Sequence, residues 1–262
     1  MTLHKTYADG AIAVEGGTVA RITLNVPTRR NAVSQAMWQA LPGICRDLAG
    51  ARVVVLSGAG GHFSAGADIS EFDRVYADDA TIAASNAAVR AGQQAVADIG
   101  CPVIAMVDGV CVGGGCGLAL HADLRFASER ARFAITPAKL GLAYSFEDTR
   151  RLIETVGPAA AKDLLFSGRM VAAAEALRLG LVDQVVPPDR LEAEVTAYAA
   201  GIAAQSSASH RVTKRMVAAV QRGAPSPEDL AAFDGLFSGA DFREGAAAFR
   251  EKRPPDYGDP LT

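Results

Sequence analysis

Three consecutive glycines, Gly113 to Gly115, are the stretch of this chain best suited to chemistry by backbone groups. An apolar strand within 108–112 is predicted to run into them, and a stretch of helical composition, 118–122, follows. A separate segment typical of a buried strand, 102–107, lies ahead of this run. Glycine at a strand-to-helix turn lets backbone N–H groups approach a ligand, and the start of a helix adds partial positive charge. The triplet therefore predicts a site for an anion or a developing oxyanion, although a tight turn with no room for side chains explains it equally well.

A second glycine-rich loop, Gly58–Ile69, follows the β-branched segment 52–57, which we expect to be a buried strand. Its first glycines are similar to the start of a dinucleotide-binding fingerprint. Phe63 stands where that fingerprint needs its third glycine, however, and neither loop carries Gly-Lys-Ser/Thr. The sequence therefore disfavours a nicotinamide or nucleoside-triphosphate site.

An alanine-rich helix, about 81–99, is predicted between the second loop and the strand at 102–107. Strand, loop, helix and strand in this order form a βαβ unit with parallel strands. The two glycine loops would then lie at the same carboxyl edge of the sheet and converge on one crevice.

The remaining segments complete an α/β fold. We expect an antiparallel hairpin from 10–15 and 19–25, and a helix that Ser34 caps and that Pro42 bends or interrupts. Further strands are predicted at 122–127, 131–135 and 182–186, and helices at 145–156, 158–166, 172–179, 189–204, 210–221, 227–237 and 241–252. We place a boundary between a core, 1–200, and a helical C-terminal region, 201–262.

The amino-acid composition limits which kinds of binding partner we expect. The 262 residues are 50% hydrophobic and 21% charged, with a formal charge of −3, so nucleic acid and anionic membranes are not expected partners. The first nine residues hold no apolar signal region and no apolar stretch nears the ~20 residues that span a bilayer, so we expect a soluble, cytoplasmic protein. We expect no metal site, because the histidines are scattered and the cysteines, predicted to be buried thiols, lack paired spacing; these residues are His4, His62, His121, His210, Cys45, Cys101, Cys111 and Cys116.

Taken together, His62–Ile69 and Asp108–Leu118 resemble motifs of the crotonase superfamily, the enoyl-CoA hydratases, isomerases and their relatives. The resemblance covers nearly the whole chain, because 27–32, 167–183 and 244–254 are similar to further segments of that family. It implies a ββα spiral core with a C-terminal helical trimerisation region, assembled as trimers or hexamers. It also implies an acyl-CoA substrate and no cofactor beyond the coenzyme A of that substrate.

The resemblance assigns roles to individual positions. The backbone N–H groups of Ala67 and Gly114 would hold the oxygen of a thioester enolate. Substrate contacts would come from Arg30, Ala32, Ala65, Asp68, Ile69, Gly113, Gly117, Pro137, Phe249 and Lys252. Simpler interpretations exist for three of these: a helix cap for Asp68, which we favour, a solvated charge for Arg30, and a buried aromatic on a surface helix for Phe249.

Two positions depart from the pattern of hydratases that use a pair of glutamates. They hold Gly117 and Pro137, which cannot exchange a proton, although syn addition of water requires paired acid/base groups. Glu147 and Asp148 could supply a replacement carboxylate, but acidic residues here more commonly favour a helix start.

The segment 136–145 is similar to that of methylmalonyl-CoA decarboxylase-type members, in which a tyrosine lies near the substrate carboxylate. Tyr144 would then orient a carboxylate that leaves as CO₂, a reaction that needs no general base; a half-buried aromatic before a helix is the other interpretation. The leading prediction is an enoyl-CoA hydratase/isomerase family enzyme. The alternatives are a decarboxylase that uses Tyr144 and a non-catalytic acyl-CoA-binding protein.

Overall fold

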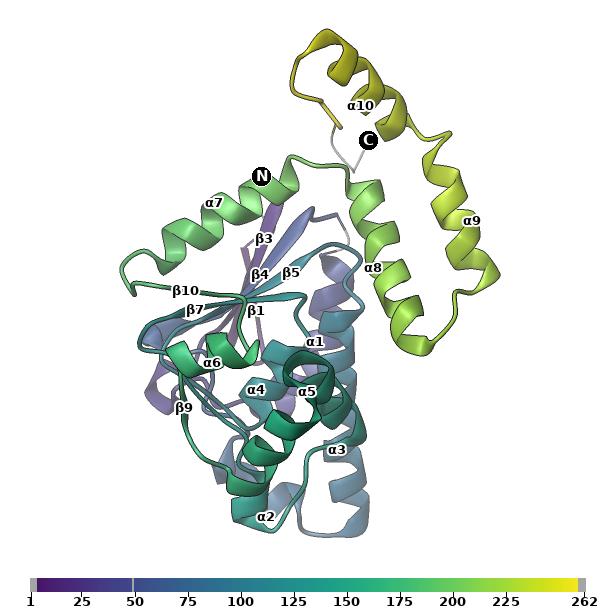
Figure 1. Cartoon of the computed structure of the whole chain (residues 1–262). Coiled ribbons are helices and arrows are strands. Elements are labelled where there is room, and N and C mark those ends of the chain that lie inside the picture. Colours follow the sequence, from purple (N-terminus) through teal and green to yellow (C-terminus); the bar gives the residue numbers. More distant parts are fainter. Residues whose placement is uncertain (1–3, 49, 259–262) are drawn as a thin grey trace.

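The computed structural model describes residues 4–48 and 50–258 (Figure 1). The first three residues of the predicted N-terminal segment and the last four of the expected C-terminal region lie outside the described residues. A seven-stranded sheet has the order β1-β2-β3-β4-β5-β7-β10. Its strands are β1 (His4–Tyr7), β2 (Ile12–Glu15), β3 (Val19–Leu24), β4 (Val53–Gly58), β5 (Val103–Val107), β7 (Leu124–Ser128) and β10 (Gln184–Val186).

The sheet is mixed. β1, β2 and β3 pair antiparallel, which confirms the predicted hairpin, whereas β3, β4, β5, β7 and β10 pair parallel with their neighbours. The parallel pairing of β4 with β5 confirms the predicted βαβ unit, so the loops that follow these strands start from the same edge. β1 was not predicted, because its residues are polar and largely exposed and give no pattern of burial.

A second, three-stranded sheet consists of β6 (Val110–Val112), β8 (Arg132–Ala134) and β9 (Val171–Ala172). The sequence predicted an apolar strand ahead of the glycine triplet, which β6 confirms, but it did not show that this strand belongs to a second sheet. The chain leaves the large sheet at Asp108-Gly109, where Gly109 has a φ of 53°, and enters the small sheet before the glycines. The triplet therefore follows a strand of the second sheet.

The helices agree with the predicted segments except at 72–75, where none was predicted, and at 114–120, where the helix starts within the glycine triplet and not at 118. They are α1 (Gln35–Asp47), α2 (Phe72–Val75), α3 (Asp79–Ala97), α4 (Gly114–Leu120), α5 (Phe146–Ser167), α6 (Ala173–Leu179), α7 (Leu191–Ala203), α8 (Ser207–Arg222), α9 (Pro227–Leu236) and α10 (Ala240–Glu251). Ser34 caps α1 as expected, but Pro42 does not interrupt that helix. α5 joins the two predicted helices across a kink at Gly157.

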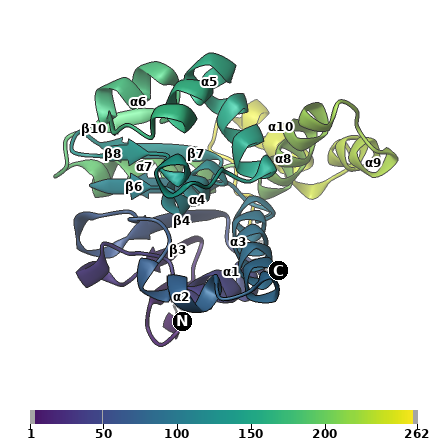
Figure 2. The ribbon, with the colours of Figure 1, turned by 90° about the horizontal axis from the view of Figure 1, so that it is seen from below.

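The large sheet has a hydrophobic layer on each face. α7 covers one face, where Val195 and Ala199 pack against Val53, Val55 and Ile104. The main core lies on the other face, and α1 and α3 pack side by side there (Figure 2). Alternate residues of β4 point into opposite layers, as expected for a strand buried on both faces.

The last three helices extend away from the layers, with α8 beside the body of the fold and α9 and α10 farther out (Figures 1 and 2). Within residues 4–48 and 50–258, no helix combines the length and apolar character needed to cross a membrane. The same residues contain no group of three or more His, Cys, Asp or Glu side chains placed to hold a metal ion. The four cysteines are buried free thiols, as predicted.

Candidate functional site

The loop after β4 presents the backbone of Ala67 in a fixed orientation. Ala67 forms a parallel bridge with Val33, in which the N–H of Val33 donates to Gly66 (2.7 Å) and the N–H of Asp68 donates to Val33 (3.1 Å). These bonds flank Ala67 on both sides and leave its own N–H pointing away from Val33. The backbone of Ala67 is therefore fixed by hydrogen bonds of the neighbouring residues, while its own N–H does not take part in them.

Two buried polar residues that the sequence reasoning missed, Asn31 and Ser64, anchor this loop. The Asn31 amide donates to the carbonyl oxygens of Ala59 (2.8 Å) and His62 (2.7 Å). The Ser64 hydroxyl donates to the carbonyl of Asn31 (2.8 Å) and accepts from the N–H of Gly66 (3.1 Å). Both side chains are fully buried, so these bonds fix the backbone that leads to Ala67.

The glycine triplet presents a second amide, that of Gly114, at the start of α4. Gly113 has φ 53° and ψ −119°, a conformation that favours glycine. Its N–H donates to Ala134 (2.8 Å), and its carbonyl accepts from the N–H of Gly117 (3.1 Å) and from the hydroxyl of Tyr144 (2.6 Å). Because that carbonyl shares a peptide plane with the N–H of Gly114, these bonds fix the direction of the second amide.

The two loops meet closely. A Cβ built on Gly66 would lie 2.7 Å from the carbonyl oxygen of Val112 and 3.4 Å from the nitrogen of Gly114, and a Cβ built on Gly114 would lie 3.7 Å from the nitrogen of Ala67. Only glycine at position 66 permits this approach. Within the described part of the chain, neither the N–H of Ala67 nor that of Gly114 donates a hydrogen bond. Two unused donors thus lie on neighbouring turns.

Most of the other predicted contact residues lie in the same region. Ala65 is half-buried, Ile69 is 74% exposed, and Ala32 is buried in the adjacent N-terminal loop. Arg30 is exposed, and its carbonyl accepts from the N–H of Ala65 (2.8 Å). Of these residues, only Arg30 and Ile69 are exposed like Ala67 itself.

Asp68 and Phe249 need separate accounts. Asp68 is buried and caps the short helix Ile69–Glu71, where it also forms an ion pair with Arg29, so the favoured interpretation as a cap is confirmed. Phe249 is 87% exposed, which makes the buried-aromatic interpretation wrong. It lies with Lys252 at the end of α10, and the chain does not fold α10 back onto the two loops (Figure 1).

The chain matches the enoyl-CoA hydratase/isomerase family over residues 15–260. It belongs to that family. It is 38% identical to a Thermus thermophilus protein provisionally named an enoyl-CoA hydratase, over 94% of this chain and 100% of that one. It is 33% identical to a short-chain-enoyl-CoA hydratase of Clostridium acetobutylicum, over 94% of this chain and 96% of that one. A crystal structure from Hyphomonas neptunium, of a protein provisionally assigned to the same family, is 42% identical and superposes with a TM-score of 0.92, covering 95% of this chain and 98% of that one.

In this enoyl-CoA hydratase/isomerase family protein, neither Gly117 nor Pro137 carries an ionisable group. Gly117 lies one turn after Gly114 in α4, and Pro137 starts the short helix Pro137–Leu140. Side chains from other helices occupy the space next to Gly117. A Cβ built there would lie 2.8 Å from Oδ1 of Asp148, which comes from α5, and still closer to Nε2 of Gln93, which comes from α3.

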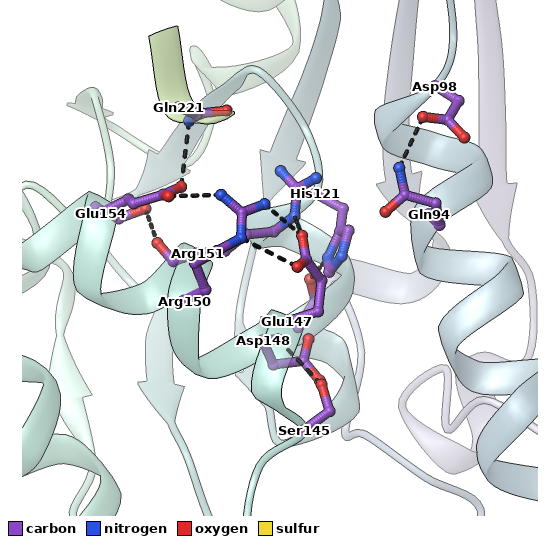
Figure 3. A network of polar contacts seen from close by, with 12 residues as sticks. Gln94, Asp98, His121, Ser145, Glu147, Asp148, Arg150, Arg151, Glu154 and Gln221 are labelled. Atoms are coloured by element: carbon purple, nitrogen blue, oxygen red, sulfur yellow. Dashed lines mark hydrogen bonds and ion pairs between the residues drawn. The ribbon is translucent and has the colours of Figure 1, made fainter. Parts of the chain in front are cut away.

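The two candidate carboxylates next to each other in α5 differ in their surroundings. Glu147 accepts from the guanidinium groups of Arg150 and Arg151, as Figure 3 shows, and these cations lower its pKa below the usual value. Asp148 accepts at Oδ2 from the Ser145 hydroxyl (2.8 Å), and its backbone N–H donates to the same hydroxyl oxygen (3.0 Å), which caps α5. Both residues therefore lie in the first turn of a helix, as the simpler interpretation expected, but only Asp148 borders Gly117.

Tyr144 is half-buried and immediately precedes Ser145, the N-cap of α5. This agrees with the simpler interpretation of Tyr144 as an aromatic residue at a loop-to-helix junction. Burial raises the pKa of its phenol well above the usual value, so the hydroxyl keeps its proton near neutral pH. That single proton is given to the carbonyl of Gly113.

A cavity of about 990 Å³ lies elsewhere, between α3, α5 and α8, and neither Ala67 nor Gly114 lines it. Its wall holds the ionic network of Figure 3, in which Glu154 pairs with Arg150 and also accepts from Gln221 of α8 (3.2 Å). We place the candidate site at the two loops and not in this cavity, because paired side chains of both signs cover the wall and leave few groups for a ligand.

Proposed function

We propose that the protein is an enzyme that acts on an acyl-CoA thioester and stabilises the enolate of that thioester with the N–H groups of Ala67 and Gly114. The observation that carries this proposal is the pair of unused amides on neighbouring turns, joined by the close approach at Gly66. Membership of the enoyl-CoA hydratase/isomerase family supports the substrate class.

The two amides suit this chemistry because charge appears on the thioester oxygen as the α-carbon loses a proton or a carboxylate. Donors held by rigid turns need no reorganisation at that moment, and one such donor typically accounts for about 10²–10³ in rate. The bonds that Asn31, Ser64 and Gly113 make provide this rigidity.

Hydration or isomerisation fits the site better than decarboxylation assisted by Tyr144. To orient a substrate carboxylate as a donor, the Tyr144 hydroxyl would have to give up its 2.6 Å bond to Gly113, which supports one of the two amides. The relatives from Thermus thermophilus and Clostridium acetobutylicum are also named as enoyl-CoA hydratases.

Crotonyl-CoA, methylmalonyl-CoA and butyryl-CoA test the proposal. We expect hydration of crotonyl-CoA, or exchange of the α-proton of butyryl-CoA with solvent deuterium, to exceed decarboxylation of methylmalonyl-CoA. If CO₂ is lost from methylmalonyl-CoA faster than the other two reactions proceed, the decarboxylase alternative would be supported instead. Binding of all three thioesters without reaction or exchange would show a non-catalytic acyl-CoA-binding protein and overturn the enzyme proposal.

We also propose that the protein assembles as a homotrimer or a dimer of trimers through its C-terminal helices. Four phenylalanines of α9, α10 and the intervening turn are between 45% and 87% exposed in the single chain: Phe233, Phe237, Phe242 and Phe249. Such exposed aromatic surface is typical of an interface. Light scattering that finds a monomer at micromolar concentration would contradict this assembly.

A further inference from the structure

Asp148 is the least satisfied acidic side chain near the site. It is 5% exposed, and its Oδ1 is one of two buried side-chain atoms without a hydrogen-bond partner among the residues that the structure describes. A buried carboxylate normally has partners for both oxygens, because an unpaired polar atom in the interior is costly. The Ser145 hydroxyl accounts for Oδ2, whereas the amide of Gln93 faces Oδ1 without forming a hydrogen bond of normal geometry.

Oδ1 is aimed at α4. A Cβ at Gly117 would lie 2.8 Å from it, so glycine at this position leaves the space that the carboxylate fills. Gly117 and Gly114 are three residues apart on one helix, which places their Cβ positions about 5–6 Å from each other. The carboxylate oxygen therefore lies about one helical turn from the amide of Gly114, and the α-carbon of a thioester is two bonds from the oxygen that this amide would hold.

We propose that Asp148 is the acid/base group of this site, delivered from α5 to the side of Gly117. The inference rests on the proposed function, because it needs a thioester held by Ala67 and Gly114. Oδ1 takes the α-proton of the acyl group, the C–H electron pair becomes the enolate double bond, and the carbonyl electron pair moves to the oxygen at the two amides. The reverse step returns the proton from Oδ1 to carbon.

The surroundings of Asp148 suit proton exchange. Burial raises its pKa above the usual aspartate value, although the hydrogen bond from Ser145 and the nearby amide of Gln93 oppose this, so its basicity exceeds that of an exposed carboxylate. The charged and titratable groups that face it are Glu147 and Arg151 of α5 and the phenol of Tyr144. α3 contributes only the neutral amide of Gln93.

The test is uptake of deuterium at the α-carbon of butyryl-CoA, measured by mass spectrometry for wild type, Asp148→Asn and Glu147→Gln. Asparagine keeps the size of the side chain and an oxygen for Ser145, so the variant should fold. We expect exchange to fall at least about 100-fold in Asp148→Asn, since a positioned acid/base group typically contributes 10²–10⁴-fold. Glu147→Gln, the matched control one residue away, should stay within about threefold of wild type.

Ser145→Ala and the pH profile separate catalysis from helix capping. Ser145→Ala removes the cap bond but keeps the carboxylate, so it should lower the melting temperature and retain most of the exchange. The wild-type exchange rate should rise with pH through the raised pKa of Asp148. This rise in the pH–rate profile should be absent in Asp148→Asn. Equal exchange rates in wild type and Asp148→Asn, or the same rise of rate with pH in both, would overturn only the role of Asp148. No exchange in wild type would instead overturn the proposed function.

Discussion

The phenolic oxygen of Tyr144 lies 2.6 Å from the carbonyl oxygen of Gly113. This carbonyl and the N–H of Gly114 belong to the same peptide plane, so the phenol lies behind one of the two amides that we propose as oxyanion donors. The structure thus gives Tyr144 a contact with the backbone of the site, where the sequence offered a contact with a substrate carboxylate.

We predict that Tyr144→Phe lowers kcat about 5- to 10-fold on every thioester that the enzyme turns over, with a smaller effect on KM. The loss corresponds to one hydrogen bond of about 1 kcal/mol that fixes the amide of Gly114. Steady-state kinetics with crotonyl-CoA check the prediction, and Tyr7→Phe, which removes an exposed hydroxyl bonded to Asp47, is the matched control. Loss of activity confined to methylmalonyl-CoA would instead place the phenol at a substrate carboxylate.

The sequence predicted the regular part of the fold because its signals are local. Alternation in 10–25, the β-branched run at 52–57 and the apolar spacing of 189–204 each indicate an element that the structure contains. The change of sheet at Gly109 was not predictable in this way, because β5 and β6 have the same apolar character and differ only in their pairing partners.

The backbone part of the candidate site follows from the positions of the glycines, whereas side chains that meet from distant elements leave no local signal in the sequence. The glycine loops predicted that two turns converge, and the family resemblance assigned Ala67 and Gly114 within them, but nothing local shows that Asn31 reaches Ala59 or that Ser64 reaches Asn31. The same holds for Gln93 and Asp148, which lie 24 and 31 residues from Gly117 in the sequence and approach it only after α3 and α5 pack against α4.

Gly66→Ala should cost most of the activity. Gly66 has φ 96°, and a methyl group there would lie 2.7 Å from the carbonyl oxygen of Val112, which must move and separate the two amides. We expect kcat/KM to fall about 10²- to 10³-fold, the loss typical of one oxyanion donor.

Gly223→Ala is the control for Gly66→Ala. Gly223 has a similar φ of 90° at the end of α8, but nothing lies within 4 Å of the added methyl group. Its backbone strain of about 1–2 kcal/mol should lower the melting temperature and leave kcat/KM unchanged. If the two variants lose the same activity, strain and not the approach of the loops explains the effect.

Gly117→Ala tests the placement of Asp148 without removing a carboxylate. Alanine favours a helix by about 1 kcal/mol over glycine, but this methyl group would displace the ends of Gln93 and Asp148. Both are flexible side chains, so the protein should fold while proton exchange falls about 10-fold or more. Gly43→Ala in α1, where nothing lies within 4 Å, provides the same helix preference without the collision. Exchange at the wild-type rate in Gly117→Ala would argue against a carboxylate working beside that residue.

The buried His121 should make stability fall in acid. Its Nδ1 lies 2.7 Å from the carbonyl oxygen of Gly117, and since a carbonyl only accepts, Nδ1 carries the proton of a neutral ring. Burial, with help from Arg151, lowers the pKa of His121 from 6.5 to about 4. Between these values the unfolded chain binds a proton that the folded protein does not. The contribution of His121 is therefore complete above pH 6.5 and is lost as the pH falls through about 4.

The predicted loss is roughly 3 kcal/mol, because one pKa unit corresponds to about 1.4 kcal/mol. Denaturant unfolding of wild type and His121→Asn between pH 7.5 and 4 measures it, since asparagine can donate to Gly117 but does not titrate. The free energy of unfolding of the variant should fall less steeply with acid, and the difference between the two curves isolates the histidine from other groups that titrate in this range. Parallel curves would mean that His121 is protonated in the folded protein as readily as in the unfolded chain.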